Sequence, residues 1–179
     1  METMKQKLDN AYKALKDQGG YANKLAAPRL QKIVISVGTG KRAKVDREFQ
    51  KHVAERLAKI TGQKPSATAA KKSIAGFKIR TGDPVGQYVT LRGARMNDFL
   101  DKLIHIALPR TKDFRGLSRD SVDAIGNLTF GIREHTIFPE TANEDVRDVF
   151  SLAVTLVSTA GSKKAGQSFY EYLGVPFKK

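Results

Sequence analysis

The chain has 179 residues with 32 lysines and arginines against 18 aspartates and glutamates, which gives a net charge of +14 at pH 7. A chain of this length can form one compact domain that buries roughly 70% of its unfolded surface, and so large a positive charge is typical of polyanion-binding proteins rather than metabolic enzymes. The absence of cysteine excludes disulfides, thiolate metal sites and a cysteine nucleophile, and it fits a reducing cellular interior.

Helix-like and strand-like patterns alternate in the first half of the chain. Apolar residues at helical spacing, followed by a glycine pair, predict an amphipathic helix over residues 4 to 18. In the run LQKIVISV apolar and polar residues alternate, which predicts a half-buried strand over residues 30 to 37. A second helix is expected from Asp46, a good N-cap residue, to Gly62, and the β-prone run KPSAT follows it.

The second half adds three strand-like and two helix-like segments. Strands are expected over residues 87 to 92, 127 to 132 and 151 to 159, and helices over residues 96 to 107, ended by Pro109, and 165 to 173. This order predicts an α+β fold in a single domain over residues 1 to 179, with one antiparallel sheet and the helices packed on one of its faces. The other face is expected to be open for a partner.

Positive charge is concentrated in the first half of the chain. Residues 64 to 95 contain seven lysines and arginines and one aspartate, whereas residues 96 to 150 contain seven against ten acidic residues. We therefore expect the first half to bind an anion, and the acidic middle to face solvent or a basic neighbour.

A basic loop beside a strand is the main functional signal in the sequence. Lys71, Lys72, Lys78 and Arg80 surround turn glycines, so the loop can approach RNA closely while its cations contact phosphates. Phosphate contacts provide affinity but no choice of sequence. The alternative interpretation is a basic face that meets only solvent.

Recognition of particular bases would come from the polar side of the strands. Tyr88 offers a stacking surface, and Thr90 and Arg92 offer hydrogen-bonding groups on the same strand. Lys32 and Ser36 lie on the polar side of the first strand. These groups suit folded RNA, whose 2′-hydroxyls and loop bases are exposed.

The motif GTGK, residues 38 to 41, invites comparison with a phosphate-binding loop of nucleotide hydrolases. Such a loop needs a glycine and a hydroxyl at the positions that Ile35 and Arg42 occupy here. We therefore interpret the motif as a tight turn that carries Lys41, Arg42 and Lys44 toward a phosphate backbone.

Catalytic and metal-binding patterns are weak. His52 and His105 fall within helical patterns, and the carboxylates between residues 134 and 148 lack the framework of a metal loop. We predict no catalytic residue, metal, cofactor or small-molecule substrate. The second candidate function is that of an RNA-modifying enzyme. Such an enzyme needs a cofactor loop or a catalytic carboxylate pair, and we find neither pattern in the sequence. A third candidate, a peripheral membrane protein, needs a helix face rich in Trp or Phe, which this sequence lacks. We also expect neither a signal peptide nor a membrane span of about eighteen apolar residues.

Short motifs occur in a fixed order along the chain. They are ITGQKP at 60 to 65, KKSIAGFKIR at 71 to 80, PVGQYVTLRG at 84 to 93, LPR at 108 to 110, DFRGL at 113 to 117, GIRE at 131 to 134, IFPE at 137 to 140, and the terminal PFKK. Together they resemble the bacterial large-subunit ribosomal protein of family five. The resemblance implies a non-catalytic α+β domain whose open sheet face holds 5S rRNA in the central protuberance. It also implies a cytoplasmic, ribosome-bound protein that contacts large-subunit rRNA and neighbouring ribosomal proteins.

The resemblance implies 5S rRNA contacts at Gln63, Thr90 and Arg92. The family usually has asparagine where this chain has Ser36, which keeps a hydroxyl but has a shorter reach. With the basic and stacking residues included, the predicted 5S rRNA-binding residues are Lys32, Ser36, Gln63, Lys64, Lys71, Lys72, Tyr88, Thr90 and Arg92.

Two further contacts follow from the resemblance. The loop over residues 76 to 86 is similar to the family's hairpin that touches the elbow of the peptidyl-site tRNA. The predicted tRNA contacts are Gly76, Phe77, Lys78, Ile79, Arg80, Thr81 and Gly82. The region around IFPE resembles the family's bridge to a basic protein of the small-subunit head. The carboxylates expected to form it are Glu140, Glu144, Asp145 and Asp148.

Overall fold

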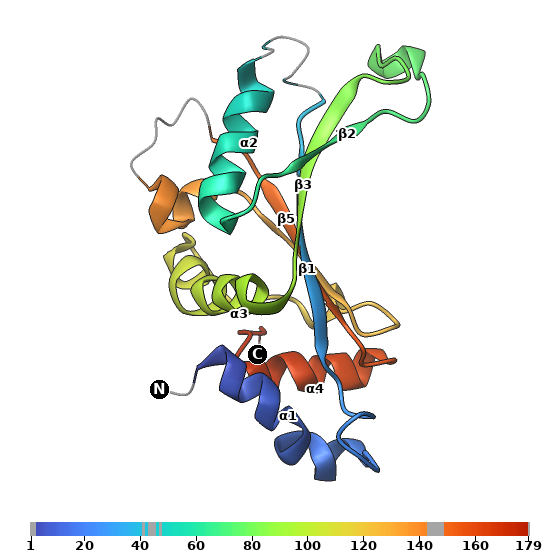
Figure 1. Ribbon diagram of the computed structural model, residues 1–179, viewed down its shortest axis with the longest axis vertical. Helices are drawn as coiled ribbons and strands as arrows, with labels where there is room; N and C mark the ends of the chain where they lie inside the picture. The colour runs from blue at the N-terminus through green and yellow to red at the C-terminus, as the bar shows by residue number, and fades with distance from the viewer. Residues whose placement is uncertain (1–2, 41, 43–45, 47, 143–148, 179) are drawn as a thin grey trace. The chain divides into compact units, whose positions relative to one another are not determined.

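The protein has an α+β fold, as the sequence predicts. The structure is a computed structural model, and it describes residues 3–40, 42, 46, 48–142 and 149–178. The helices and strands follow one another in the predicted order (Figure 1). In chain order they are α1 Met4–Gly19, β1 Leu30–Gly38, α2 Glu48–Thr61, β2 Ser66–Ala69, β3 Pro84–Leu91, α3 Gly93–Lys102, β4 Leu128–Ile132, β5 Leu152–Ser158 and α4 Lys163–Leu173.

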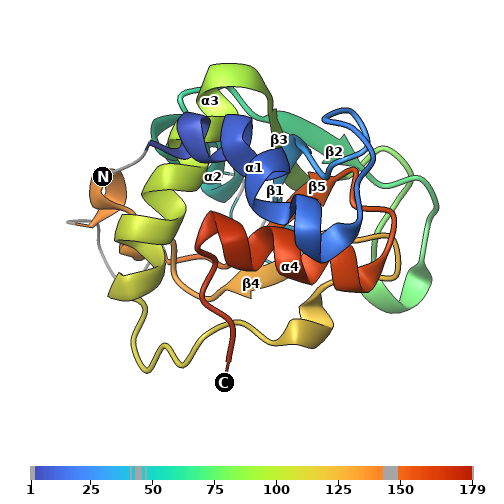
Figure 2. The same cartoon turned by 90° about the horizontal axis from the view of Figure 1, so that it is seen from below.

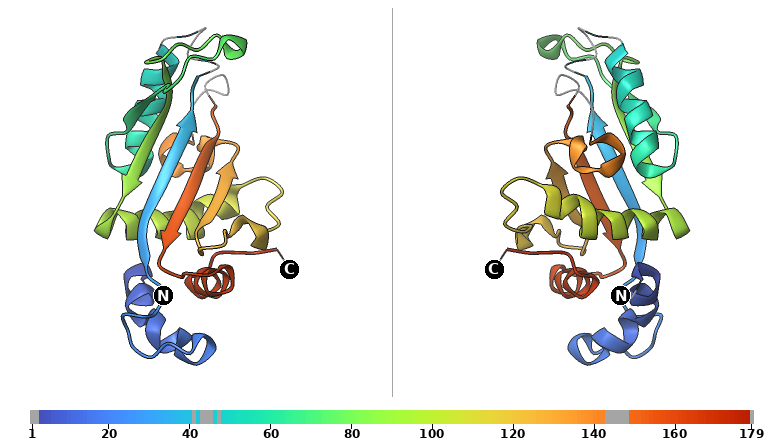
Figure 3. Two further views of the ribbon diagram at one scale, coloured as in Figure 1. Left: turned by 90° about the vertical axis from the view of Figure 1, so that its right-hand side faces the viewer. Right: turned by 90° about the vertical axis from the view of Figure 1, so that its left-hand side faces the viewer.

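The strands form one sheet in the order β2-β3-β1-β5-β4, which can be followed in Figure 3. Strands β2 and β3 are antiparallel neighbours joined as a hairpin. The amide of Thr159, after the end of β5, donates to the carbonyl of Arg29, before the start of β1, over 3.0 Å. These two strands therefore also run antiparallel, and the predicted antiparallel sheet is confirmed.

The chain divides into two compact units. Unit 1 comprises Met1–Val34, Leu91–Phe130 and Val154–Lys179, and unit 2 comprises Ile35–Thr90 and Gly131–Ala153. The divisions fall inside β1, β3, β4 and β5. That the whole chain is a single domain, as expected from its length, stays a prediction.

Unit 1 contains α1, α3 and α4, with α1 packed against both other helices (Figure 2). The hydroxyl of Ser162 accepts the amide of Ala165 at 3.3 Å and so caps the start of α4. The same helix contributes Phe169 and Tyr170, which have no exposed surface, to the core. The Tyr170 hydroxyl lies 2.8 Å from the carbonyl oxygen of Leu156 in β5 and 3.1 Å from that of Gly126. This buried hydroxyl therefore fixes α4 to the sheet.

Unit 2 contains α2, the β2–β3 hairpin and the second half of β1. The apolar stripe of α2, including Val53 and Leu57, is buried. On β1 and β3 of this unit, Ile35, Val37 and Val89 are buried, and each is followed by a more exposed residue; Gln87 is buried as well. Helix α2 therefore covers one face of these strands, and Figure 3 shows it on that face from both sides.

The helix expected over residues 96 to 107 differs from the prediction. Helix α3 ends at Lys102, a wide π turn occupies Leu103–Ala107, and Pro109 lies in the short 3-10 turn that follows. The π turn ends on the amide of Leu108, which donates to the carbonyl of Leu103. Pro109 thus begins a new turn, where its missing amide costs nothing, instead of ending an α-helix.

Candidate nucleic-acid interface

The β2–β3 hairpin positions most of the predicted RNA-binding residues of unit 2. Ser66 pairs with Tyr88 and Thr68 pairs with Gly86, and the register shifts by a bulge between Thr68 and Ala69. A Cβ atom on Gly86 would lie 2.9 Å from the carbonyl oxygen of Val37 in β1. The close approach of β1 and β3 therefore requires glycine at this position.

The loop at the far end of the hairpin is closed by its own hydrogen bonds. The amide of Gly82 donates to the carbonyl of Ala70 over 3.0 Å. Higher in the loop, the Ser73 hydroxyl accepts the amide of Thr81 at 3.0 Å and lies 3.1 Å from its hydroxyl. A short 3-10 turn, Ala75–Phe77, forms the tip and ends at Lys78 in a left-handed conformation with φ of 50°. The residues predicted to contact tRNA thus belong to an ordered turn.

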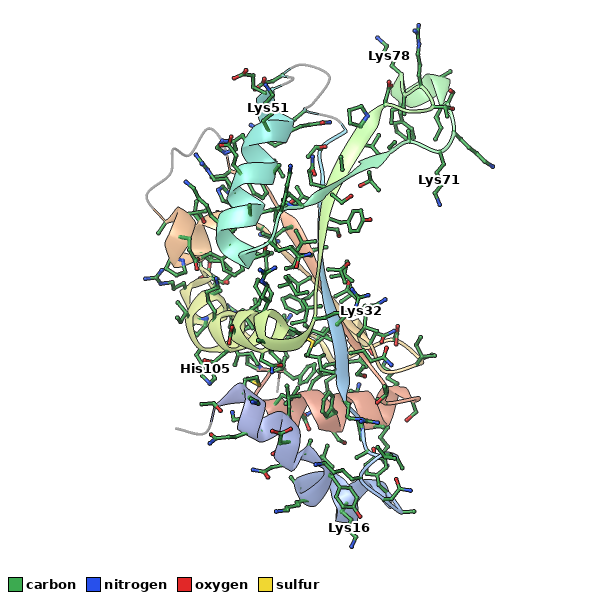
Figure 4. The ribbon with its side chains drawn as sticks, in the orientation of Figure 1. Lys16, Lys32, Lys51, Lys71, Lys78 and His105 are labelled. Carbon is green, nitrogen blue, oxygen red and sulfur yellow. The ribbon has the colours of Figure 1, made fainter. Side chains whose placement is uncertain are left out.

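The surface of this loop combines cations with apolar side chains. Lys71, Lys72, Lys78 and Arg80 are all exposed, and Figure 4 shows Lys71 and Lys78 pointing away from the ribbon at the end of the hairpin. Phe77 is 69% exposed. The nearby carboxylate of Asp83 accepts the backbone amide of Arg80 at 2.7 Å. This carboxylate has a structural role in the turn, and the loop remains strongly basic.

The outward face of β3 agrees with the predicted alternation. Val89 and Leu91 are buried, whereas Tyr88 is 38% exposed and Thr90 is half-buried. The amide nitrogen of Gln63 donates to the carbonyl of Thr90 over 3.3 Å. The structure therefore brings together two of the residues predicted to bind 5S rRNA.

A turn after α2 holds Gln63 in this position. The Thr61 hydroxyl donates to the carbonyl of Leu57 at 2.6 Å and accepts the amide of Gln63 at 3.3 Å. Between them, Gly62 takes a φ of 67°, which favours glycine. The motif TGQ thus ends the helix and directs the glutamine side chain toward β3.

The other predicted 5S rRNA-binding residues are placed separately. Lys64 is exposed in unit 2, and Ser36 lies on the exposed side of β1 and lines an open hollow of about 430 Å³ with Arg133 and Ser151. Lys32 and Arg92 belong to unit 1, where Lys32 is half-buried on β1 (Figure 4) and Arg92 is exposed.

The GTGK motif begins at the last residue of β1, and its next two residues bond to the neighbouring strand β3; that the motif forms a tight turn stays a prediction, because Lys41 lies outside the described residues. The amides of Thr39 and Gly40 both donate to the carbonyl of Val85 over 3.0 Å. Arg42 donates to the carbonyl of Val149 over 3.0 Å, and its guanidinium carbon lies 4.7 Å from the centre of the Phe49 ring. These contacts give Arg42 a structural role that the sequence interpretation did not include. Lys41 and Lys44 lie outside the described residues.

The predicted bridge region is described only in part. Glu140 is exposed in the 3-10 turn Pro139–Thr141, whereas Glu144, Asp145 and Asp148 lie outside the described residues. Before this turn, the fully buried His135 stacks on Phe150 with ring centres 4.1 Å apart, and its Nδ1 accepts the amide of Phe150 at 3.4 Å. This stack supports the turn of Glu140. Sequence reasoning missed it because no local pattern links residues so far apart.

Features of catalysis are sparse in the part of the chain that the structure describes. No group of three or more histidines and carboxylates there could hold a metal ion. His105 lies on a helix surface, where its Nδ1 is 3.1 Å from an Asp101 carboxylate oxygen. In the same described residues, no helix combines the length and apolarity that crossing a bilayer requires.

Comparisons with known proteins give a consistent result over the whole chain. Residues 23–80 match the family model described as "Ribosomal protein L5", and residues 84–177 match a second model, which describes the C-terminus of the same ribosomal family. The chain is 48% identical to the large ribosomal subunit protein uL5 of Rubrobacter xylanophilus over 92% of this chain and 91% of that one. It is 46% identical to uL5 of Campylobacter jejuni over 100% and 99% of the two chains, and 44% identical to uL5 of Anaeromyxobacter sp. strain K over 98% of both.

Proposed function

Because the chain belongs to the ribosomal protein L5 family and is a structural constituent of the large ribosomal subunit, not an enzyme, we propose that it binds 5S rRNA and helps to anchor it in the central protuberance. The proposed location is the ribosome in the cytoplasm. Large-subunit rRNA and neighbouring ribosomal proteins are its other proposed partners.

The observation that carries this proposal is the fixed arrangement of Gln63, Thr90 and Tyr88. The hydrogen bond from the Gln63 amide to the Thr90 carbonyl holds the glutamine beside the outward face of β3. Its side-chain oxygen remains an acceptor for a ribose or base. Two residues along the strand, Tyr88 provides an exposed ring on which an unpaired base can stack. Hydrogen-bonding and stacking groups are thus held at fixed positions on and beside one strand, which supports selection of a particular RNA fold.

The test is a comparison of 5S rRNA with an unrelated structured RNA of the same length over a salt series. Non-specific phosphate binding weakens steeply with salt for both RNAs. We expect a preference for 5S rRNA of at least about tenfold that persists near 0.2 M salt, because base and ribose contacts do not depend on released counterions. Equal affinities for both RNAs at this salt concentration would overturn the proposal.

We further propose that the loop over residues 76 to 86 contacts the peptidyl-site tRNA. Its support is chemical: the tip is closed by its own hydrogen bonds, is basic and exposed, and presents the aromatic ring of Phe77 beside Lys78. Cations of this kind contact phosphates, and an exposed ring can pack on a nucleotide. A bridge from Glu140, Glu144, Asp145 and Asp148 to a basic protein of the small-subunit head is also proposed, on the grounds of charge complementarity.

Lys78→Ala should distinguish the proposed tRNA-contacting loop from the proposed 5S rRNA-binding surface. We expect the affinity for 5S rRNA to change by less than about twofold. Lys78 lies outside the group of Gln63, Tyr88 and Thr90 that is proposed to select this RNA, and a single exposed phosphate contact contributes little to the affinity. Ribosomes that carry the variant should release peptidyl-site tRNA faster than wild type. The matched control is Lys51→Ala, which removes another exposed lysine, on α2 (Figure 4). If Lys78→Ala weakened 5S rRNA binding and left tRNA retention unchanged, the division would be wrong.

A further inference from the structure

A loop and the C-terminal tail of unit 1 form a small clasp that the preceding proposals do not use. We define the clasp as residues 110–121 together with residues 175–178. The amide of Leu117 donates to the carbonyl of Pro176, and the amide of Lys178 donates to the carbonyl of Leu117, each over 2.8 Å. Leu117 and Phe177 form a parallel bridge. Figure 2 shows the tail leaving α4 and running to this loop.

A glycine fixes how closely the two segments approach. Gly116 has a φ of 94°, and a Cβ atom on it would lie 2.7 Å from the backbone nitrogen of Lys178. Both the backbone conformation and the lack of space therefore require glycine. The clasp is held as a defined backbone shape before any partner binds, which lowers the ordering cost of binding.

The cations of the clasp, together with Lys163 of the adjoining helix α4, fall into two groups. Arg119 forms an ion pair with Glu171, and Lys163 of α4 pairs with Asp120 over 2.8 Å. These cations hold the clasp to α4. A second group, also exposed, differs in that it makes no side-chain hydrogen bond or ion pair within the described residues: Arg110, Lys112, Arg115 and Lys178. Asp113 is the one carboxylate near them on the loop that lacks a cation partner among the described residues.

The chemistry of this surface favours RNA over protein. A protein interface has an apolar or aromatic centre. The large apolar side chains that are exposed in the described residues lie at Leu25, Ile74, Phe77, Tyr88, Ile106 and Ile125, and none is in the clasp. The clasp instead offers exposed guanidinium and ammonium groups on a backbone held by hydrogen bonds, and such groups bind phosphates.

We propose that Arg110, Lys112, Arg115 and Lys178 form a second phosphate-binding surface, which holds a segment of large-subunit rRNA independently of the 5S rRNA surface. The proposal depends on membership in the large subunit and not on 5S rRNA binding. The proposal also differs from the sequence-based expectation for residues 96 to 150. This segment carries more acidic than basic residues and was expected to face solvent or a basic neighbour. In this segment the acidic side chains Asp101 and Asp120 pair with His105 and Lys163 and leave the clasp cations available.

The test uses the full chain and a large-subunit rRNA transcript without 5S rRNA. The variant is Arg110→Gln/Lys112→Gln/Arg115→Gln, and the control is Lys5→Gln/Lys13→Gln/Lys16→Gln, which removes the same charge from exposed positions on α1. Each lost phosphate contact lowers the slope of log affinity against log salt by roughly 0.7 to 0.9. We expect the slope to fall by about 2 to 3 in the variant, with a hydroxyl-radical footprint lost from one rRNA segment. The control should change neither.

Three outcomes decide the proposal. Unchanged 5S rRNA affinity together with the loss of slope and footprint supports it. Equal effects of variant and control overturn it, because charge alone would then explain the change. Reduced incorporation into subunits with an unchanged rRNA slope also overturns it and indicates an acidic protein partner. Thermal melting of both variants checks the fold, and Arg110→Lys/Arg115→Lys, which keeps the charge, should retain most of the slope.

Discussion

Replacing Arg92 by alanine should weaken 5S rRNA binding by about tenfold to a hundredfold, the loss that removing one guanidinium contact to a base or phosphate pair produces. Arg92 stands at the N-cap of α3 in an extended conformation, and its side chain makes no capping hydrogen bond. It is exposed. Its removal should therefore leave the fold intact, so the loss of affinity would report on the RNA contact itself. Filter binding or fluorescence titration at fixed salt measures the change.

Arg95→Ala is the matched control for Arg92→Ala. Arg95 is also exposed, lies only one turn further along α3, and carries the same charge. If the 5S rRNA contact depends on position, Arg95→Ala should change the affinity by no more than about threefold. Equal losses in both variants would show that only the positive charge of this segment matters, and the assignment of Arg92 to selective recognition would then fail.

The strands were predictable because their side chains alternate. In β1 the alternation of LQKIVISV predicts a strand over residues 30 to 37; the observed strand extends it by one residue, and Ile33, Ile35 and Val37 are buried. β3 begins at Pro84 instead of residue 87. The extra residues pair with β2, as in the match of Ala69 with Pro84. A proline can begin a strand but gives no sequence signal that a neighbour will pair with it.

Features set by distant packing were not predictable. The π turn at Leu103–Ala107 depends on which side chains the core accepts, and Leu103, Ile104 and Ala107 are all buried there. Lys78 takes a positive φ because the tip of its loop closes on itself, although lysine has no preference for that conformation. The stack of His135 on Phe150 joins residues on either side of an acidic segment.

The candidate site shows the same division between local and distant information. The alternation of β3 is local, so Thr90 could be chosen from the strand pattern, and Gln63 could be chosen from the resemblance of the motif ITGQKP to the ribosomal family. Their hydrogen bond could not, because it joins residues 27 positions apart. The clasp of unit 1 is a stronger case, since the backbone bonds between Leu117 and the C-terminal tail, and the ion pair of Arg119 with Glu171, join residues more than fifty positions apart.

Tyr170→Phe should change how stability depends on alkaline pH. Burial raises the pKa of Tyr170 to about 12 from its ordinary value of 10.0. Between these two values the unfolded chain has lost the phenolic proton while the folded protein keeps it. The folded state then binds more protons than the unfolded state, so the free energy of unfolding falls as pH rises through this window. The stabilisation is fully present below pH 10 and is lost by about pH 12, with a total of roughly 3 kcal/mol, because each pKa unit corresponds to about 1.4 kcal/mol.

Urea unfolding of both proteins at several pH values from neutral to about 11.5 measures this effect. At neutral pH the variant should be less stable by about 1 kcal/mol, because the carbonyls of Leu156 and Gly126 lose the buried hydroxyl that bonds to them. Lysine titration in the alkaline range affects both proteins alike, so the difference between their curves isolates Tyr170. The wild-type advantage should shrink above pH 10 and reverse before pH 12, because phenylalanine has no proton to lose. If the two stability curves ran parallel over this whole range, the Tyr170 hydroxyl would not be buried as the structure has it. The hydrogen bond that joins α4 to β5 would then be contradicted.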